Sequence, residues 1–327
     1  MSALPDRPVL LSCGDPSGIG PEIAAKAHEV LGARLPFVWI GDPAHLPRGT
    51  KVREISHPSE ALSHAGRALP VLVHDFPEAA RPGEPHPANA RAVIDVIARG
   101  VDLVMRGEGA ALCTAPINKK VLKDGAGFAF PGHTEYLAHL AGGADVVMML
   151  ACDTLRVVPA TIHIALSDVP RAFTPALLRD TVRITADGLR RDFGIENPRI
   201  AVAGLNPHAG EGGAMGREEI DWIADTISGL RAEGYAVTGP LPADTMFHAS
   251  ARARYDAAIC AYHDQALIPI KTLAFDQGVN VTLGLPFVRT SPDHGTAFDI
   301  AGRGIANPAS LIAALEMAAR MGAARTA

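Results

Sequence analysis

Short runs of apolar and β-branched residues alternate with longer helical patterns along this chain, and this alternation limits its possible folds more than any other feature. The strand-like runs are Val9–Ser12, Phe37–Ile40, Val71–Val73, Ala110–Thr114, Val146–Leu150, Arg199–Ala203, Ala257–Ala261 and Val279–Leu283. Amphipathic helical patterns lie between several of them, at Pro87–Met105, Pro175–Phe193 and Arg217–Ala232. Short buried strands that alternate with amphipathic helices predict a layered α/β fold.

The length of the chain bears on the number of lobes. With 327 residues, of which 48% are hydrophobic, the chain can bury a large core and build two lobes. It contains no internal repeat, low-complexity tract or long linker, and Arg81–Pro87 is only a short proline-rich turn. We therefore expect two lobes that share one continuous structure.

Charge and cysteine usage exclude several classes of partner. A formal net charge of -5 lacks the basic excess that nucleic-acid binding requires. The cysteines Cys13, Cys113, Cys152 and Cys260 lie in or beside apolar runs without a C-x-x-C pair, as buried thiols in a reducing compartment do. Met1–Pro8 lacks the apolar stretch of a signal peptide, and no apolar run approaches about 18 residues. We expect a cytoplasmic protein that binds neither nucleic acid nor membrane.

The loop Gly14–Glu22 follows a strand and leads into a helix with Pro21 in its first turn. Its glycines would let a ligand approach the backbone closely. It lacks both the Lys-Ser/Thr of a P-loop and the G-x-G-x-x-G spacing of a dinucleotide fingerprint. On its own, the segment favours a tight strand-to-helix turn over a ligand site.

Three histidines occupy unusual settings. His163 lies in the apolar run Thr161–Leu166, His208 lies in the glycine-rich loop Gly204–Gly213, and His263 follows a strand. Imidazole suits zinc, cobalt and similar divalent ions, and three protein ligands with an open position is the catalytic pattern. Their wide separations match no compact zinc motif, so spacing alone favours unrelated, hydrogen-bonded histidines.

The segment Phe130–Glu135 contains a Pro-Gly turn that puts His133 and Thr134 at the start of a helix running to about Leu140. Backbone N–H groups at such a helix start favour an anion. A helix that is simply capped by Thr134 is an equally good interpretation.

Lys271, Asn280 and Arg289 stand within or beside apolar stretches. A charged side chain is seldom fully buried there without a partner, so Lys271 and Arg289 are candidate clamps for phosphate and carboxylate. For either residue alone, an ordinary ion pair or a snorkelling surface charge is the commoner explanation.

Seven motifs occur in order along the chain, namely Gly14–Glu22, Thr114–Lys119, Gly132–Glu135, Leu205–Glu211, Leu241–Thr245, Tyr262–Gln265 and Gly278–Pro286. Taken together, they resemble the 4-hydroxythreonine-4-phosphate dehydrogenase family over essentially the whole chain. Several motifs in a fixed order identify a family far more specifically than any single motif does. They therefore outweigh the non-functional interpretations given above for the single segments. The first loop opens with Cys13-Gly14-Asp15 where the family pattern has Pro-Gly-Glu, which keeps an acid.

The resemblance implies a fold similar to isocitrate and isopropylmalate dehydrogenases: two lobes, each a three-layer α/β/α arrangement, and not a Rossmann fold. The missing dinucleotide fingerprint is then expected. We expect residues 1–130 with 275–327 to form one lobe and residues 131–274 the other, with the active site in the cleft between them.

The resemblance also implies roles for individual residues. Metal ligands would be His163, His208 and His263. Substrate contacts would come from His133, Thr134, Lys271, Asn280 and Arg289. The adenosine end of the cofactor would lie against His294, Gly295, Thr296 and Ala297 and the segment Gly302–Asn307, which includes Gly302 and Asn307. Further cleft candidates are Asp15, Gly18 and Asp244.

The implied activity is the oxidation of 4-phosphohydroxy-L-threonine, a small phosphorylated hydroxy amino acid, by NAD or NADP with a divalent metal (zinc, magnesium or cobalt). The resemblance also implies a homodimer with a shared active site, in which the neighbouring chain supplies His263. A related dehydrogenase of phosphorylated threonate or erythronate, or of a cis-dihydrodiol, is the main alternative. A metal-dependent hydrolase or aldolase and a non-catalytic metal- or phosphate-binding protein are the others.

Overall fold

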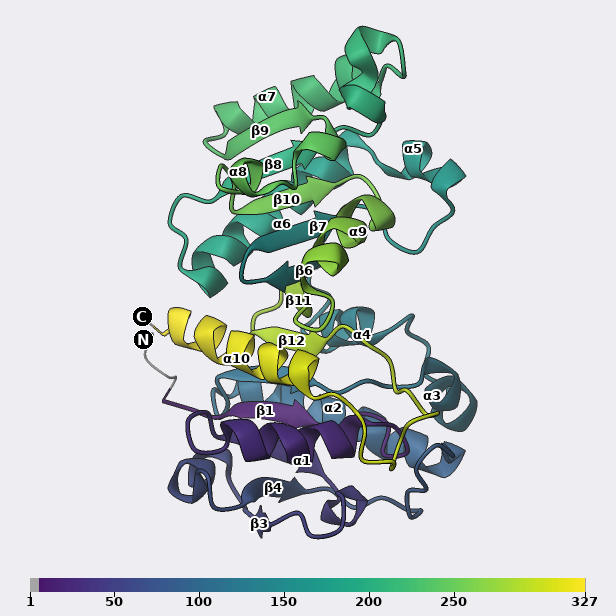
Figure 1. The fold of residues 1–327 in the computed structure, drawn as a ribbon, viewed down its shortest axis with the longest axis vertical. Helices are drawn as coiled ribbons and strands as arrows, with labels where there is room; N and C mark the ends of the chain where they lie inside the picture. The colour runs from purple at the N-terminus through teal and green to yellow at the C-terminus, as the bar shows by residue number, and fades with distance from the viewer. Residues whose placement is uncertain (1–5, 327) are drawn as a thin grey trace. The chain divides into compact units, whose positions relative to one another are not determined.

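The computed structural model describes residues 6–326, which divide into two compact units (Figure 1). The first unit runs to Ala144 and resumes at Leu285, and the second is Asp145–Gly284. Each unit has its own sheet order with helices packed on the strands, which confirms the predicted α/β class. Neither order is that of the Rossmann dinucleotide-binding fold.

The strands of the first unit pair in parallel in the order β3-β4-β2-β1-β5-β12. They are β1 (Val9–Ser12), β2 (Phe37–Gly41), β3 (Val52–Glu54), β4 (Leu69–Val73), β5 (Ala111–Thr114) and β12 (Arg289–Pro292). The helices are α1 (Gly20–Leu31), α2 (Ala90–Met105), α3 (Lys119–Ala126), α4 (His133–Leu140) and α10 (Ala309–Ala324), with 3-10 turns η1 (Pro43–His45), η2 (Pro58–His64) and η3 (Pro87–Asn89).

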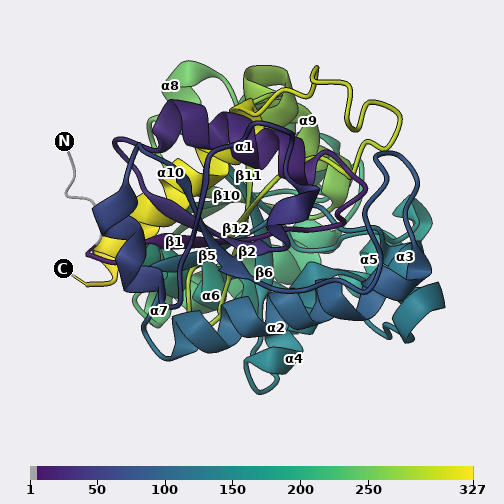
Figure 2. The same cartoon turned by 90° about the horizontal axis from the view of Figure 1, so that it is seen from below.

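Helices cover both faces of this sheet. In Figure 2, α1 and α10 lie on one side of β1, β2 and β5, and α2 and α4 lie on the other. The central strands β1, β2 and β5 are buried along their whole length, as expected of parallel strands covered on both faces. The carboxyl ends of β1 and β5 therefore lead into loops at one edge of a rigid layer.

The second unit has a mixed sheet in the order β11-β6-β7-β10-β8-β9. Its strands are β6 (Val147–Cys152), β7 (Leu155–Pro159), β8 (Arg199–Ala203), β9 (Ala236–Leu241), β10 (Ala257–Cys260) and β11 (Val279–Leu283). Its helices are α5 (Val169–Ala172), α6 (Pro175–Phe193), α7 (Ala224–Ala232), α8 (Ala249–Arg252) and α9 (His263–Ala274), with the short turns η4 (Leu166–Asp168), η5 (Pro207–Gly213), η6 (Glu219–Ile223, a π-helix) and η7 (Ala243–Thr245). Strands β7, β10, β8 and β9 are parallel, whereas β6 is antiparallel to both β7 and β11.

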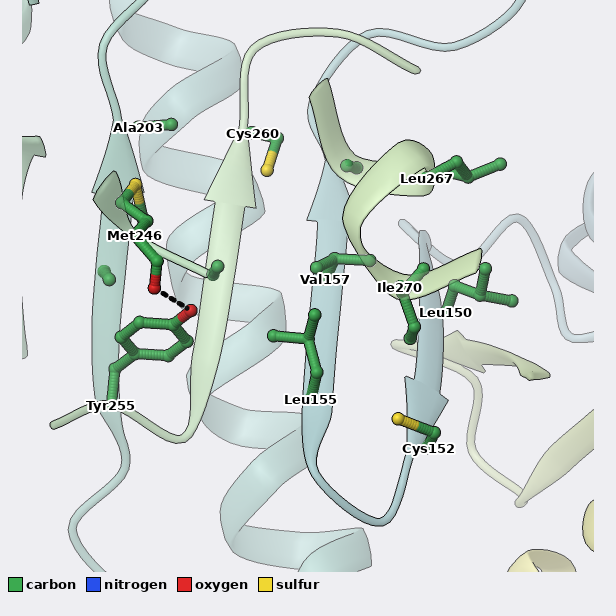
Figure 3. Packing of buried hydrophobic residues seen from close by; sticks show 13 residues of the cluster. Leu150, Cys152, Leu155, Val157, Ala203, Met246, Tyr255, Cys260, Leu267 and Ile270 are labelled. Carbon is green, nitrogen blue, oxygen red and sulfur yellow. Dashed lines mark hydrogen bonds between the residues drawn. The ribbon is translucent and has the colours of Figure 1, made fainter. Parts of the chain in front are cut away.

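Helix α9 packs against β6, β7 and β10, and this contact forms a hydrophobic core (Figure 3). Ile270 of α9 lies beside Leu150 and Val157 of the strands, and Leu267 belongs to the same cluster. The phenol of Tyr255 also lies in this core and donates a hydrogen bond to the Met246 carbonyl at 2.9 Å. A packed α9 fixes the start of the helix, where His263 stands.

Among the predicted elements, the bounds of the buried strands agree best with the structure. β1, β8 and β11 have the predicted bounds, as do helices α6 and α4. Four strands that the sequence did not predict are β3, β7, β9 and β12. β3 is exposed and only three residues long, whereas β12 is buried but reads as Arg-Thr-Ser-Pro, without an apolar run.

The boundaries between units lie later in the chain than the sequence analysis placed them. Residues 131–144 belong to the first unit, because α4 packs against α2. Residues 275–284 belong to the second unit, because β11 pairs with β6 from Val279 to Leu283. Motif order alone did not reveal these contacts.

Candidate active site

The three candidate metal-binding histidines follow three neighbouring strands of the second unit. β7, β10 and β8 are adjacent and parallel, so their carboxyl ends meet at one edge of the sheet. His163 follows β7, His263 follows β10, and His208 follows β8. Loops at the carboxyl ends of parallel strands are the usual place for ligand sites in α/β folds.

Hydrogen bonds join the ends of these strands. The Thr161 hydroxyl donates to the Ala261 carbonyl at 2.7 Å, which ties the end of β7 to the end of β10. Gln265 accepts from the Ala261 N–H at 2.7 Å and donates to the Gly204 carbonyl at 2.8 Å, which ties β10 to β8. Three loops far apart in the sequence are thus anchored to one another.

His163 and His263 of one chain lie close together. Their ring centroids are 5.7 Å apart, and both side chains line a cavity of about 330 Å³ with Thr161 and Tyr262. The Nδ1 atom of His263 lies 2.7 Å from a carboxylate oxygen of Asp264. An ionised carboxylate only accepts hydrogen bonds, so this contact favours the neutral tautomer with the proton on Nδ1, which leaves on Nε2 the lone pair that a metal ligand needs.

His208 lies apart from this pair. It is exposed, and with Ala209 and Glu211 it has a positive φ, in a loop with glycines at 210, 212 and 213. The loop is anchored by Glu219, whose carboxylate accepts hydrogen bonds from the backbone and side chain of Asn206. Among residues 6–326 no group of three His, Cys, Asp or Glu side chains lies close enough to hold a metal. One chain therefore brings two of the three histidines together.

The other candidates of the second unit are dispersed over its elements. Lys271 lies in the last turn of α9, with its ammonium 5.8 Å from the centroid of the Phe275 ring. Asn280 lies on β11 opposite Leu150 of β6. Asp244 is exposed beside α9.

In the first unit, His133, Thr134 and Arg289 form a candidate anion site. His133 and Thr134 are the first residues of α4, where backbone N–H groups lack helical acceptors. The Nε2 atom of His133 is buried without a hydrogen-bond partner among the described residues. Arg289, at the start of β12, is only 3% exposed and donates to the Thr114 hydroxyl at 2.8 Å. A buried guanidinium and an available buried imidazole suit a small anionic ligand.

Burial sets the protonation of both groups. It lowers the pKa of His133 well below 6.5, and the charges of Arg289 and Lys119 lower it further. It also lowers the pKa of Arg289 to about 10, against smaller opposing effects of Cys113 and Glu135. At neutral pH the site therefore holds a neutral imidazole beside a charged guanidinium.

We expect His133→Gln to reduce the loss of stability in acid. Because the pKa of His133 is lowered on folding, the unfolded chain binds more protons below the ordinary value of 6.5. The free energy of unfolding therefore falls with pH from about 6.5 downward, and the variant lacks this contribution. Urea denaturation at about pH 5 and pH 7 measures the difference.

His64→Gln is the matched control, because His64 lies in the first unit away from this site. The histidines His28, His45 and His74, whose pKa values burial also lowers, remain in both variants. An acid dependence identical to that of the wild type in His133→Gln would contradict a buried neutral imidazole.

The candidate cofactor residues lie on loops that pack against the Gly14–Glu22 loop. The Ile19 N–H donates to the Thr296 carbonyl at 3.0 Å. A Cβ on Gly18 would lie 2.9 Å from that same oxygen, so only glycine allows this approach. His294 has a buried Nε2 atom without a hydrogen-bond partner among residues 6–326. Asp15 is buried, accepts from the Ser17 N–H at 3.0 Å, and has a pKa raised by burial.

Two residues that the sequence analysis missed hold the Gly302–Asn307 segment in place. The buried Glu22 carboxylate accepts from the Ala306 N–H at 2.8 Å and from Lys26 at 2.9 Å. The Lys26 ammonium donates to the carbonyls of Gly304 and Ala306. The Asn307 side chain accepts from the Ala309 N–H at the start of α10. Glu22 could have been recognised as a functional candidate from its position at the end of the motif Gly14–Glu22.

Two further residues of the anion site were also missed. Thr114, the last residue of β5, is the hydrogen-bond acceptor for Arg289, and Lys119 begins α3 close to His133. Both lie in the motif Thr114–Lys119, which the sequence analysis used for the resemblance without giving its residues a role.

The fold and these two groups of residues define a class of protein, a two-unit α/β protein with a candidate metal site in one unit and a candidate anion site in the other. The chain belongs to the family described as pyridoxal phosphate biosynthetic protein PdxA, whose model matches residues 33–318. This confirms the family that the sequence motifs indicated.

Individual relatives agree with this family. The chain is 67% identical to 4-hydroxythreonine-4-phosphate dehydrogenase of Roseobacter denitrificans, over 97% of both chains. It is similar to the crystal structure of the protein of that name from Klebsiella pneumoniae, with a TM-score of 0.87 and 38% identity over 97% of this chain and 99% of the other. A terephthalate 1,2-cis-dihydrodiol dehydrogenase from Burkholderia xenovorans has a TM-score of 0.67 and 29% identity, over 96% and 98%.

No helix within residues 6–326 is long and apolar enough to span a membrane.

Proposed function

We propose that this chain oxidises 4-phosphohydroxy-L-threonine to 2-amino-3-oxo-4-phosphooxybutanoate with NAD or NADP and a divalent metal. The product, a β-keto acid, loses carbon dioxide to give 3-amino-2-oxopropyl phosphate for pyridoxine 5'-phosphate (vitamin B6) synthesis. The observation that carries the proposal is the 67% identity, over 97% of both chains, with a relative named for this dehydrogenase. The buried anion site of the first unit supports it, because the substrate has a phosphate and a carboxylate.

The histidines at the strand ends fit a divalent metal by their chemistry. Imidazole nitrogens are ligands for zinc, cobalt and related ions, and His163 and His263 already stand together with a lone pair available on His263. We propose that His208 completes the set. When bound, a divalent cation supplies Lewis-acid stabilisation of negative charge on the substrate oxygen.

The chain's own residues bind and orient the substrate in this proposal. Arg289, His133 and Thr134 hold an anionic group, and Lys271 and Asn280 contribute further polar contacts from the second unit. A held anionic group fixes the direction of the C3–H bond, which is what hydride transfer to a nicotinamide requires.

We assign the nicotinamide cofactor to the loops that carry His294, Gly295, Thr296 and Ala297 and to the segment Gly302–Asn307. A Cβ added to Gly295 or Gly304 would meet nothing within 4 Å, so the backbone there is open to a ligand. The buried Nε2 atom of His294 offers a polar contact. Asp15 and Gly18 form the neighbouring loop, and Asp244 remains a candidate of the second unit.

We also propose a homodimer with a shared active site. Large apolar side chains are exposed on α9 and just after it, namely Ile268 (63%), Leu273 (46%) and Phe275 (74%). Exposed apolar groups that cluster in this way mark a protein–protein contact more often than a free surface.

The cytoplasmic location stays a prediction.

A cis-dihydrodiol dehydrogenase is the second candidate, because the chain is 29% identical over nearly its full length to a structure with that name. A dihydrodiol substrate has no phosphate. The phosphorylated substrates, threonate and erythronate included, use the buried Arg289 site better than a dihydrodiol would.

A steady-state assay tests the proposed function. We expect reduced nicotinamide to appear with 4-phosphohydroxythreonine and NAD or NADP, and a chelator to abolish it. Phosphorylated threonate, phosphorylated erythronate and a cis-dihydrodiol are the comparison substrates. A higher kcat/KM for any of them than for 4-phosphohydroxythreonine would overturn the assignment of substrate.

A further inference from the structure

Lys119 is a cation in an unusual place. The Asn118 side chain accepts from the Val121 N–H at 3.0 Å and so fixes the start of α3, which makes Lys119 the first residue of the helix. A positive charge is unfavourable in the first turn of a helix, where the dipole is positive. The ammonium of Lys119 forms no hydrogen bond or ion pair with any residue that the structure describes. The adjacent Lys120, by contrast, is paired with Asp124 one turn along.

The side chain of Lys119 extends to the start of a second helix, α4. A Cβ built on Gly132, the N-cap of α4, would lie 3.5 Å from the Lys119 Nζ and 3.4 Å from its Cε. His133 follows directly, and the charge of Lys119 is among those that lower its pKa. The ammonium therefore lies at the start of α4, where the first N–H groups lack helical acceptors and where the buried Nε2 atom of His133 has no hydrogen-bond partner among the described residues.

The charges around this point favour an anion. Arg289 and Lys119 contribute two positive charges, and the carboxylate of Glu135, whose Oε2 would also lie 3.4 Å from a Cβ on Gly132, contributes one negative charge. His133 is neutral at pH 7, because burial keeps it so. A cation that lies against the helix dipole and without a carboxylate partner costs stability unless a ligand anion compensates it.

We propose that Lys119 binds the phosphate group of the substrate, together with Arg289, His133 and the first turn of α4. This deepens the proposed function and rests on it, because it names the group that the site holds. A phosphate is tetrahedral and carries close to two negative charges, so it accepts donors from several directions and matches two cations. Lysine suits this role as a mobile point charge, whereas a planar carboxylate is already matched by the single guanidinium of Arg289.

The test measures the binding of inorganic phosphate to the full-length enzyme by calorimetry, without substrate or cofactor. We expect Lys119→Met to weaken phosphate binding about tenfold or more, as the loss of a charge-assisted hydrogen bond does. Lys119→Arg keeps the charge and should stay within about threefold of the wild type. Lys120→Met is the matched control, because it removes the neighbouring charge outside the site and should leave the affinity unchanged.

Steady-state kinetics with phosphorylated and unphosphorylated substrates show whether Lys119 binds the phosphate or the carboxylate of the substrate. We expect Lys119→Met to lower kcat/KM for 4-phosphohydroxythreonine about tenfold and to leave kcat/KM for unphosphorylated 4-hydroxythreonine unchanged. Equal losses for both substrates would overturn the proposal and assign Lys119 to the carboxylate. Phosphate affinity that is the same in Lys119→Met and wild type would overturn it as well. If the wild type binds phosphate through Lys119 but reduces no nicotinamide, the anion site stands and the proposed dehydrogenase activity fails.

Discussion

His163→Ala, His208→Ala and His263→Ala should each lower kcat about a thousandfold and release most of the bound divalent metal. Removal of one of three imidazoles weakens the affinity and the geometry of the site, and a metal acting as Lewis acid contributes several kcal/mol to the reaction, which corresponds to about three orders of magnitude. Elemental analysis of the purified variants and steady-state kinetics measure the two effects. Unchanged metal content in any of the three would remove that histidine from the ligand set.

Mixtures of these variants test the shared site. If one chain supplies two histidines and its partner the third, two of the three pairings should each regain about half of the wild-type activity per heterodimer. The histidine common to both active pairings is the one that the partner supplies. The family resemblance assigns this role to His263, whereas the 5.7 Å between the rings of His163 and His263 in one chain favours His208. Heterodimers that form but stay inactive in all three pairings would show that each chain holds its own site.

Arg289→Met should lower kcat/KM for the phosphorylated substrate about a hundredfold, because a buried charge-assisted hydrogen bond contributes roughly 1.5 to 3 kcal/mol. The affinity for NAD or NADP should change less than about twofold, since the proposed partner of Arg289 is the substrate anion. The folded protein should not be destabilised by loss of the charge, because burial lowers the pKa of Arg289 to about 10 and so makes the charged form costly. Ligand titrations and thermal unfolding measure these effects.

Arg106→Met is the control for Arg289→Met. Arg106 lies at the end of α2 and forms exposed ion pairs with Asp102 and Glu108, which contribute little to stability. Its substitution should change neither kcat/KM nor the melting temperature measurably. Parallel losses of substrate and cofactor affinity in Arg289→Met would contradict a role confined to the substrate.

The sequence predicted the fold class and the buried strands because a strand covered on both faces must be apolar along its length. Val9–Leu11 and Ile200–Ala203 show this pattern, and the predicted bounds of the two strands that contain them, β1 and β8, were correct. β12 escaped detection because its buried residues, Arg289 to Pro292, are mostly polar and satisfied by contacts from distant segments, such as Thr114 and the Ala314 carbonyl. Hydrophobic periodicity cannot predict a strand whose polar side chains are stabilised by hydrogen-bond partners in other segments, 24 residues away for Thr290 and 175 residues away for Arg289.

The sequence predicted which residues belong to the candidate site, but not which of them lie close together in the fold. The motif Gly132–Glu135 indicated His133, and the family resemblance implied Arg289. The structure places both in one unit, with the Nε2 atom of His133 buried and Arg289 bonded to Thr114. Spacing along the chain could not indicate that Lys119 reaches the same helix start, because that proximity depends on how α3 and α4 fold back. Nor could it show that His208 stands apart from His163, since the φ angles of a glycine-rich loop do not follow from its composition.

The backbone at His163 and His208, with φ of 54° and 51°, adopts the left-handed conformation that suits glycine. A non-glycine residue there costs on the order of 1 kcal/mol of folding stability. In a descendant that no longer required these imidazoles, replacement by glycine would bring a gain in stability rather than a loss. Histidine at these two positions therefore costs stability that glycine would not, which is the cost expected where a side chain is kept for its chemistry.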